Sequence, residues 1–317
     1  MVQSDLKTNI TDLLITRVNK DPKLPLMAKQ TEPNVWTNVS AADYLEEVKA
    51  LAKGFIAAGI EPGQRVGLMS KTRYEWALCD FALWFAGAVS VPIYESSAPS
   101  QIEWILSDSG ASACIFENSD LETLFKTVKK SLPDVKKTWL IEGSNLGDLV
   151  ASGSKITNEV LEARRTSANL DSLATIIYTS GTTGKPKGCE LLHRGFVDLC
   201  KNAEAVLPDV VCPGGSTLLF LPMAHVFARF VSVLCASGGV QVGHQPDAKN
   251  VAPAMQSFPP TFLLAVPRVF EKVYNSAEQR AESGGKGKIF RAAAETAIAW
   301  STALDSPKGP SFGLNLK

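Results

Sequence analysis

The sequence predicts an α/β fold with largely parallel sheets, because short apolar segments alternate with helical patterns along the chain. The apolar segments have the length and the β-branched content of buried strands. The predicted strands are 65–70, 88–94, 113–117, 138–142, 174–179, 217–222, 238–242 and 261–267. The length of this series favours two packed α/β subdomains over a single one.

Two segments between these strands have clear helix boundaries. In residues 40–59, Ser40 is the predicted N-cap and Gly59 lies at the predicted C-terminal stop. Apolar residues recur at helical spacing between them. Residues 100–110 end in the same way, at Gly110. Both are expected to be helices packed on the predicted sheet.

The apolar run 76–93 approaches the length of a membrane span. Asp80 interrupts it, and its character changes at Gly87 from helix-forming to β-branched. Pro92 then stops the second part. The run is therefore predicted to be a buried helix followed by a buried strand, and no membrane-spanning helix is expected.

Composition excludes some classes of protein. Lys+Arg and Asp+Glu are both 32, so the net charge is zero and nucleic acid is not an expected partner. The six cysteines form no C-x-x-C pair and no zinc-finger cluster, which is typical of reduced, buried thiols. The first 20 residues do not resemble a signal peptide. A cytoplasmic location is expected.

The segment YTSGTTGKPKG, residues 178–188, carries the clearest functional signal. It follows a predicted strand and precedes a helical pattern, and it combines hydroxyls, glycines and lysines. Glycines let backbone N–H groups approach an anion, hydroxyls add donors, and Lys187 adds a charge. The segment is therefore predicted to bind phosphate. It is not a Walker A loop, because Pro186 follows Lys185, and the chain has no G-x-G-x-x-G after a strand.

This loop resembles the signature of the adenylate-forming superfamily, which includes acyl-CoA synthetases, luciferases and adenylation domains. The resemblance extends from about Trp36 to near the end of the chain. FLPMAHVFARF (220–230) and AVPRVFEKVYN (265–275) are similar to the acyl-site and gate motifs of the bacterial long-chain fatty acid–CoA ligases. The implied fold is the large N-terminal domain of such an enzyme, truncated before its end.

The resemblance also implies a chemistry. In the family a carboxylate attacks the α-phosphate of ATP to give acyl-AMP and pyrophosphate, and the thiol of CoA then displaces AMP. No protein nucleophile is needed, so catalysis consists of positioning and neutralisation of phosphate charge. The substrates would be a long-chain fatty acid, ATP with Mg²⁺, and CoA. The residues implied to bind the ATP phosphates are Thr179, Ser180, Gly181, Thr182, Thr183, Gly184 and Lys187. Thr179 is also implied to help place Mg²⁺, and Lys185 is given less weight because the family varies there.

Three further residues lie in the other two motifs. His225 is implied to lie beside the carboxylate and the α-phosphate, with a positioning role favoured over proton transfer. Arg229 is implied to act near the substrate or its gate, and a structural ion pair is the equal alternative. Arg268 is implied to support the acyl tunnel or its gate, with a role at the start of a helix as its alternative. His193 is a weaker candidate, and His244 is expected in a surface loop.

The resemblance also suggests a domain organisation. Residues 1–63 are expected to pack with the second subdomain, 64–209 to form the first, 210–304 to form the incomplete second, and 305–317 to be an incomplete tail. The family's Tyr-Gly-x-Thr-Glu segment, its ribose-binding Asp and its C-terminal lysine are not found. The chain is therefore expected to be the front half of the enzyme and inactive by itself. Residues 143–169 are expected to be a connector or a surface excursion.

Three rival functions remain. A fatty acyl-AMP ligase that loads a carrier protein, or a ligase for aryl or short-chain acids, would share the chemistry. A non-catalytic nucleotide- or lipid-binding module would bind without releasing pyrophosphate. A P-loop NTPase is disfavoured by the failed motif. The sequence leaves open the acyl chain length, the oligomeric state and peripheral contact with the inner face of the cell membrane.

Overall fold

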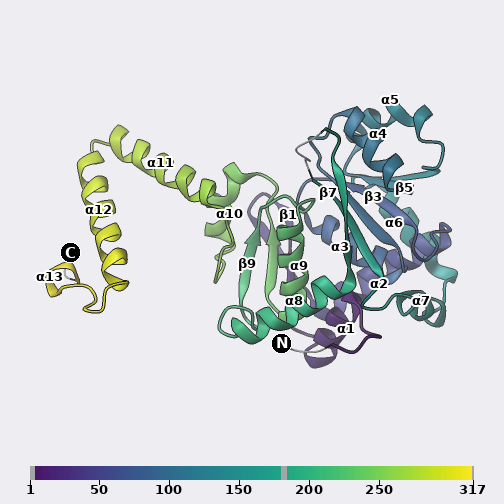
Figure 1. Ribbon diagram of the computed structural model, residues 1–317, viewed down its shortest axis with the longest axis horizontal. Helices are drawn as coiled ribbons and strands as arrows, with labels where there is room; N and C mark the ends of the chain where they lie inside the picture. Colours follow the sequence, from purple (N-terminus) through teal and green to yellow (C-terminus); the bar gives the residue numbers. More distant parts are fainter. Residues whose placement is uncertain (1–3, 180–183, 316–317) are drawn as a thin grey trace. The chain divides into compact units, whose positions relative to one another are not determined.

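A computed structural model describes residues 4–179 and 184–315. The chain forms two compact units, Met1–Leu263 and Leu264–Lys317. The first unit contains both β-sheets, and the second is helical (Figure 1). The α/β class predicted from the sequence is confirmed.

Seven of the ten strands described in the first unit lie close to predicted positions, whereas the strands at 25–32, 35–40 and 187–192 were not predicted. The described strands are β1 Pro25–Glu32, β2 Val35–Ser40, β3 Arg65–Met69, β4 Val89–Ile93, β5 Ala111–Phe116, β6 Lys137–Leu140, β7 Leu173–Thr179, β8 Lys187–Leu192, β9 Ser216–Leu219 and β10 Gln241–His244. The α-helices are α1 Ile10–Lys20, α2 Ala41–Ala57, α3 Tyr74–Phe85, α4 Pro99–Asp108, α5 Ser119–Val128, α6 Asn145–Ser152, α7 Asn158–Arg165, α8 His193–Val206, α9 Val226–Gly238 and α10 Val251–Ser257. Three 3₁₀ turns occupy Lys129–Ser131, Gly153–Lys155 and Ala248–Asn250.

The larger sheet has six strands in the order β6-β5-β3-β4-β7-β8. All neighbouring pairs are parallel except β7 and β8, which form an antiparallel hairpin. The smaller sheet has the order β2-β1-β10-β9, in which β10 is parallel to both β1 and β9. The N-terminal strands β1 and β2 therefore complete the sheet that β9 and β10 form, although some 200 residues separate them in sequence.

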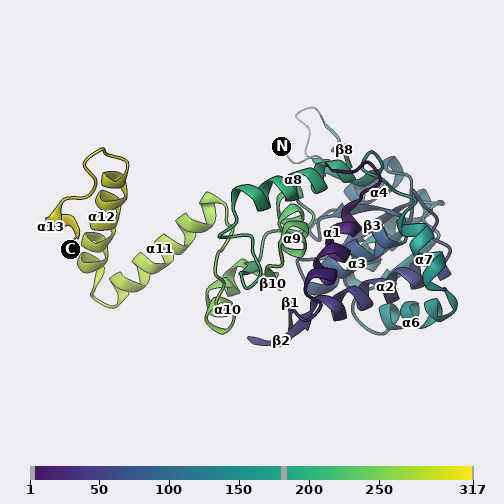
Figure 2. The same ribbon diagram turned by 90° about the horizontal axis from the view of Figure 1, so that it is seen from below.

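Side chains on β4 show which helices cover each face of the larger sheet. Val89, Val91 and Ile93 belong to the core beneath α4 and α5. Ser90 points to the opposite face, since side chains alternate along a strand, and there it meets α9. Helix α3 follows the same face, and α1 packs against α2, α8 and α9 (Figure 2). Helices α3 and α9 thus lie in the layer between the two sheets.

The helix boundaries follow local sequence chemistry. The side chain of Ser40 caps α2 by accepting a hydrogen bond from the N–H of Asp43 at 3.1 Å, as predicted. The run 76–93 forms α3 and β4, all of it buried except at Gly87, and this prediction is confirmed. Gly87 joins the two with φ +78°, a left-handed conformation that a side chain would strain. None of the helices in the described part of the chain combines the length and the apolar character that a membrane span requires.

The prediction of a strand at 261–267 is wrong. The N–H groups of Thr261 and Phe262 both donate to the carbonyl of Ser216, at the start of β9. The chain then leaves the sheet, and Pro267 begins a helix, α11. The apolar run therefore has no continuous strand partner in the described chain, and apolar composition without a partner does not make a strand.

Two other segments are more ordered than the sequence suggests. Residues 143–169, expected to be a connector, contain α6 and α7, and Gly54 allows close packing there because a Cβ would lie 2.5 Å from the carbonyl oxygen of Leu149. Strand β8 was not predicted, since residues 187–188 end the predicted phosphate loop and the predicted helical pattern begins at 191. Strand β8 forms by antiparallel pairing with β7, and the sequence of 187–192 alone does not indicate that pairing.

The second unit contains α11 Pro267–Ser283, α12 Gly287–Leu304 and the short α13 Phe312–Asn315. Helices α11 and α12 contact each other through Tyr274 and Phe290, whose ring centroids are 5.3 Å apart. Many of its large apolar side chains are exposed, including Phe270, Ile289 and Ile298. The subdomain boundaries expected at 63, 209 and 304 stay predictions.

Candidate functional site

The described residues of the predicted phosphate loop lie at the end of the β7–β8 hairpin where the two strands are joined. Thr179 ends β7 and Lys187 begins β8, and the two are paired directly across the hairpin. Both are exposed. Gly184 has φ +124°, which favours glycine, and a Cβ there would meet open space. The predicted Ser180, Gly181, Thr182 and Thr183 lie outside the described residues.

Helix α4 holds the second arm of this hairpin. The indole N–H of Trp104 donates to the carbonyl of Pro186 at 2.7 Å. The ammonium of Lys185 lies 4.1 Å from the centre of the same indole ring, which is a cation–π contact. The two lysines of the loop are therefore placed differently, because Lys185 is engaged with Trp104 and Lys187 has no ion pair with a described carboxylate. Trp104 was not identified from the sequence.

The strand pair next to the tip, Tyr178 and Gly188, is also closely packed. The hydroxyl of Tyr178 donates to Asp108 of α4 at 2.6 Å, and burial together with this carboxylate raises the pKa of the phenol. A Cβ on Gly188 would lie 2.9 Å from Ile176 and 3.1 Å from the ring of Tyr178. Packing therefore favours a glycine at 188.

A hollow of about 440 Å³ opens beside this hairpin, where β4 and β7 end. Thr179 and His225, which the sequence analysis took from separate motifs, both line it. The remaining lining residues are Tyr94, Ser97, Gln101, Ile105, Ile177, Tyr178, Pro186 and Val226. In parallel α/β sheets ligands bind outside the carboxyl ends of the strands, so this is the expected position of a site. Sequence reasoning missed Tyr94, Ser97 and Gln101, although their position just after a predicted strand was a usable signal.

His225 is the N-cap of α9. Its Nδ1 accepts a hydrogen bond from the N–H of Phe227 at 3.2 Å. The neutral imidazole therefore carries its proton on Nε2, which is left as a donor. The residue is exposed and sits at the positive end of a 13-residue helix, where an anion is stabilised. This arrangement suits a residue that orients an anionic group.

Arg229, one turn further along α9, is fully buried. Its Nε and Nη2 bind the two carboxylate oxygens of Asp80 at 2.7 and 2.6 Å. The same guanidinium also donates to Ser90 of β4 and Thr175 of β7, and it lies 4.9 Å from the ring of Trp84. With no exposed surface it has no direct access to a substrate in this structure. The geometry therefore favours the ion-pair alternative for Arg229, and its substrate role stays a prediction.

The network around Arg229 connects four elements of the first unit. It joins α3 through Asp80, β4 through Ser90 and β7 through Thr175 to the helix whose N-cap is His225. The backbone N–H of Arg229 also donates to the carbonyl of His225 at 3.3 Å. The arginine thus ties the start of α9 to the strands beside the hollow.

The other arginine and the remaining histidines lie elsewhere. Arg268 is exposed at the start of α11 in the second unit, so its gate role stays a prediction. His193 is buried, and its Nδ1 accepts from the N–H of Ile10 at 3.3 Å. The expectation that His244 lies in a surface loop is wrong. It is buried at the end of β10, because β10 is an interior strand between β1 and β9.

Comparison with known proteins identifies the family of the chain. Residues 16–304 match the family described as AMP-binding enzymes, and the chain belongs to that family. The membership predicted from the loop 178–188 is confirmed.

The more specific similarity is to long-chain fatty acid–CoA ligases. The chain is 40% identical over 312 residues to the long-chain fatty acid–CoA ligase FadD15 of Mycobacterium bovis, covering 98% of this chain and 52% of that protein. It is 28% identical over 304 residues to the ligase heimdall of Drosophila melanogaster, covering 89% of this chain and 44% of the relative. The chain thus spans about half the length of the curated relatives it matches.

Solved structures show the same fold. The inhibitor-bound N-terminal domain of FACL13 from Mycobacterium tuberculosis is 26% identical with a TM-score of 0.71, covering 83% of this chain and 64% of that one. The long-chain fatty acid–CoA ligase FadD1 from Archaeoglobus fulgidus is 23% identical with a TM-score of 0.74. The match covers 87% of this chain and 55% of the FadD1 chain. The predicted fold class, the N-terminal domain of an adenylate-forming enzyme, is confirmed.

Proposed function

We propose that these 317 residues are the front half of an AMP-forming long-chain fatty acid–CoA ligase. Two kinds of support carry the proposal. A ligase of that name is 40% identical over almost the whole chain. The single structural observation is that Thr179 and His225 line one hollow at the carboxyl ends of β4 and β7.

The reaction would proceed in two steps. A carboxylate oxygen of the fatty acid attacks the α-phosphorus of ATP, the bond to the bridging oxygen breaks, and pyrophosphate leaves. The thiolate of CoA then attacks the acyl carbonyl, and AMP leaves with the former carboxylate oxygen. Both steps join two anionic partners, so lowering charge repulsion and fixing geometry account for most of the catalysis.

Thr179 and His225 of the hollow, together with three residues outside its lining, have roles in this proposal. The hairpin tip, with Thr179 and Lys187, would bind the β- and γ-phosphates, and Lys187 would neutralise part of their charge. His225 would donate its Nε2 proton to the carboxylate or to an α-phosphate oxygen, because Nδ1 is already engaged. Asp80 and Arg229 would act as positioning residues beneath them.

Mg²⁺ would enter with ATP. Within the residues that the structure describes, no group of three or more His, Cys, Asp or Glu is arranged to hold a metal ion. The hydroxyl of Thr179 together with phosphate oxygens is a donor set that Mg²⁺ accepts, and the ion would supply charge neutralisation on the leaving pyrophosphate.

The test separates binding from catalysis. We expect the purified chain to bind ATP weakly and to show little or no palmitate-dependent ATP–pyrophosphate exchange, because the adenine-binding and C-terminal motifs are not found in it. Joining the chain to the remaining half of a related ligase should restore exchange and palmitoyl-CoA formation. Acetate and benzoate should not replace palmitate. A chimera that adenylates benzoate in preference to palmitate would contradict the long-chain assignment.

The rivals predict different products. Exchange without thioester formation from CoA, but with loading of a carrier protein, would indicate a fatty acyl-AMP ligase. Binding of ATP with no exchange even in the chimera would indicate a non-catalytic module.

We propose a cytoplasmic location. We also propose that the protein contacts the inner face of the cell membrane, because its substrate is amphipathic. Co-sedimentation of the protein with lipid vesicles tests this contact.

A further inference from the structure

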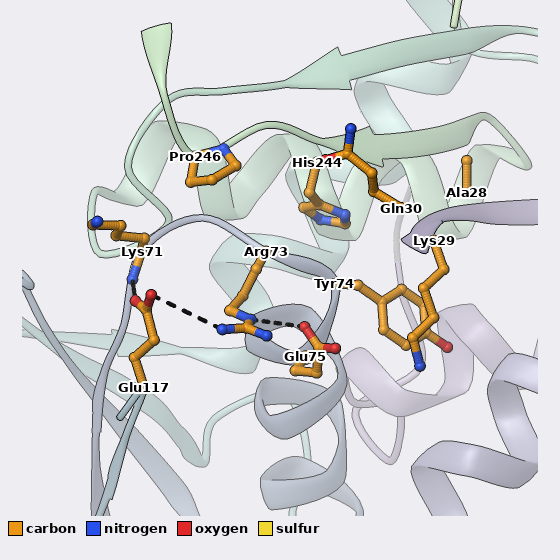
Figure 3. A pocket seen from close by; sticks show the side chains of 10 residues that line it. All are labelled: Ala28, Lys29, Gln30, Lys71, Arg73, Tyr74, Glu75, Glu117, His244 and Pro246. Atoms are coloured by element: carbon orange, nitrogen blue, oxygen red, sulfur yellow. Dashed lines mark hydrogen bonds and ion pairs between the residues drawn. The ribbon is translucent and has the colours of Figure 1, made fainter. Parts of the chain in front are cut away.

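A second cavity, of about 200 Å³, lies where the two sheets of the first unit face each other (Figure 3). It shares no lining residue with the hollow of Thr179 and His225. Its lining residues are Ala28, Lys29, Gln30, Lys71, Arg73, Tyr74, Glu75, Glu117, His244 and Pro246. Since one water needs only about 10–15 Å³ of such space, the cavity can hold a small ligand.

The cavity occupies the position where α/β sheets bind ligands. His244 is the last residue of β10, Lys71 comes two residues after β3, and Glu117 follows β5 directly. These strands belong to parallel pairs in their sheets, and ligands bind outside the carboxyl ends of parallel strands. Two sheets thus contribute strand ends to one cavity.

His244 is the observation that points to a ligand. The side chain is 4% exposed, and neither Nδ1 nor Nε2 has a hydrogen-bond partner among the described residues. Burial lowers the pKa of the imidazole to about 4, so the ring is neutral and offers one donor and one acceptor. Figure 3 shows the ring directed across the cavity towards Arg73 and Tyr74. A buried polar group without a partner is costly, and such groups in native proteins call for an explanation.

The carboxylates in the lining already have partners. Glu117 accepts hydrogen bonds from the backbone N–H of Lys71 at 2.7 Å and from the hydroxyl of Ser70 at 3.2 Å. Glu75 accepts from Nε of Arg73 at 2.8 Å. The acidic groups are therefore occupied by groups of the protein itself, and they do not call for a cation.

The cationic groups are less fully used. Lys29 and Lys71 stand on opposite sides of the cavity, and neither forms an ion pair with a carboxylate in the described ranges 4–179 and 184–315. The ammonium of Lys29 lies 4.8 Å from the ring centre of Tyr74. Three cations and two carboxylates line the cavity, which leaves a formal charge of +1. The unused capacity is that of hydrogen-bond donors and positive charge.

We propose that this cavity binds a small oxyanion, the phosphate or carboxylate group of a ligand, through the N–H of His244 between Lys29 and Lys71. The second imidazole nitrogen accepts a hydrogen bond from a hydroxyl of the ligand or from a water bound with it. The site is separate from the ATP-phosphate loop and does not depend on the proposed ligase function.

The direct test follows the ring of His244. The chain contains three histidines, so the imidazole ¹⁵N signals can be assigned with His244→Leu and followed while sodium phosphate or sodium acetate is added at constant ionic strength. We expect saturable shifts of the His244 signals. Shifts with phosphate but not with acetate would indicate that the site binds a phosphate group. Shifts with both anions would indicate that it also accepts a carboxylate group. Unmoved signals with both anions, or shifts reproduced by sodium chloride, would overturn the proposal and leave an ordered water as the partner.

Variants give a second measurement. Because its ring makes no hydrogen bond within the described protein, His244→Leu should melt at the same or a higher temperature without anion. It should bind phosphate at this site about tenfold more weakly, the loss of one charge-assisted hydrogen bond. Lys71→Gln should weaken binding about threefold, whereas Lys130→Gln, which removes an exposed lysine elsewhere, should not. The parent and the three variants are all measured with the additional substitution Lys187→Gln, which removes phosphate binding through the charge of the hairpin loop. Equal affinities in the parent and His244→Leu would contradict the assignment.

Discussion

The layer between the sheets, around Arg229, and the hairpin tip, around Thr179 and Lys187, use polar residues in opposite ways. In the layer the guanidinium of Arg229 is saturated, because it binds Asp80, Ser90 and Thr175 and has no exposed surface. At the tip, Thr179 and Lys187 are exposed and available to a ligand. Burial demands partners, so saturated groups hold the fold and free groups do the binding. The predictions below test this division.

The largest expected effect is the loss of Asp80. Asp80→Ala leaves a buried guanidinium without its counter-charge, which should lower the free energy of unfolding by about 3–5 kcal/mol in urea denaturation. The matched control is Asp171→Ala, which removes the partner of Arg194 in an exposed pair and should cost less than about 1 kcal/mol. Similar losses in the two variants would show that the buried pair of Asp80 and Arg229 is no more important for stability than an exposed pair.

Acid should destabilise the protein through His193. Burial lowers the pKa of this imidazole to about 4, with Arg229 as the second cause, whereas the unfolded chain has a value near 6.5. Below pH 6.5 the unfolded state therefore binds a proton that the folded state refuses. The contribution of neutral His193 to the free energy of unfolding is therefore fully present above about pH 6.5. As the pH falls towards 4, the free energy of unfolding decreases by up to about 3 kcal/mol.

The measurement is urea denaturation at several pH values for the parent and His193→Asn, whose amide oxygen can replace Nδ1 as acceptor for the N–H of Ile10. The variant should show a flatter dependence between pH 6.5 and 4. His244 contributes in the same window, since burial lowers its pKa to about 4 as well. If the free energy of unfolding depends on pH in the same way in the parent and the variant, His193 takes up its proton as readily in the folded state as in the unfolded state.

Packing next to the hairpin tip should be sensitive to one methyl group. Gly188→Ala places a Cβ against Ile176 and Tyr178, which should cost about 1–3 kcal/mol and disturb the contact of Tyr178 with Asp108. Gly195→Ala, in α8 with nothing within 4 Å of the new Cβ, should instead stabilise by up to about 1 kcal/mol. The melting temperatures of the two variants test this difference. An unchanged melting temperature for Gly188→Ala would show that the hairpin rearranges to make room for the methyl group.

The smallest effect distinguishes the two lysines of the loop. Lys187→Gln should weaken pyrophosphate binding about fivefold to tenfold, because it removes a free charge from the tip. Lys185→Gln should change the affinity less than about twofold, because that ammonium already lies over Trp104. Isothermal titration of both variants checks this, and the reverse order would place the phosphates on the Trp104 side of the hairpin.

The fold class followed from local patterns that burial confirms. The run 76–93 carries its own helix-to-strand switch at Gly87, and Ser40 carries its own cap, so both could be read from neighbouring residues. The loop 178–188 was recognisable because its chemistry is continuous in sequence. The strand at 261–267 failed for the opposite reason, since a strand needs a partner that the sequence does not name.

The sequence by itself determined the alternation of strands and helices and the family, and it predicted a phosphate-binding loop, because each of these depends on residues within one segment. Only the tertiary structure decided that Arg229 pairs with Asp80, 149 residues away, and that Lys185 lies on Trp104. It alone buried His244 at the end of β10 without a partner in the described chain. Burial and pairing arise between distant segments, and whether a charge is used for stability or left for a ligand depends on which groups folding brings within hydrogen-bonding distance.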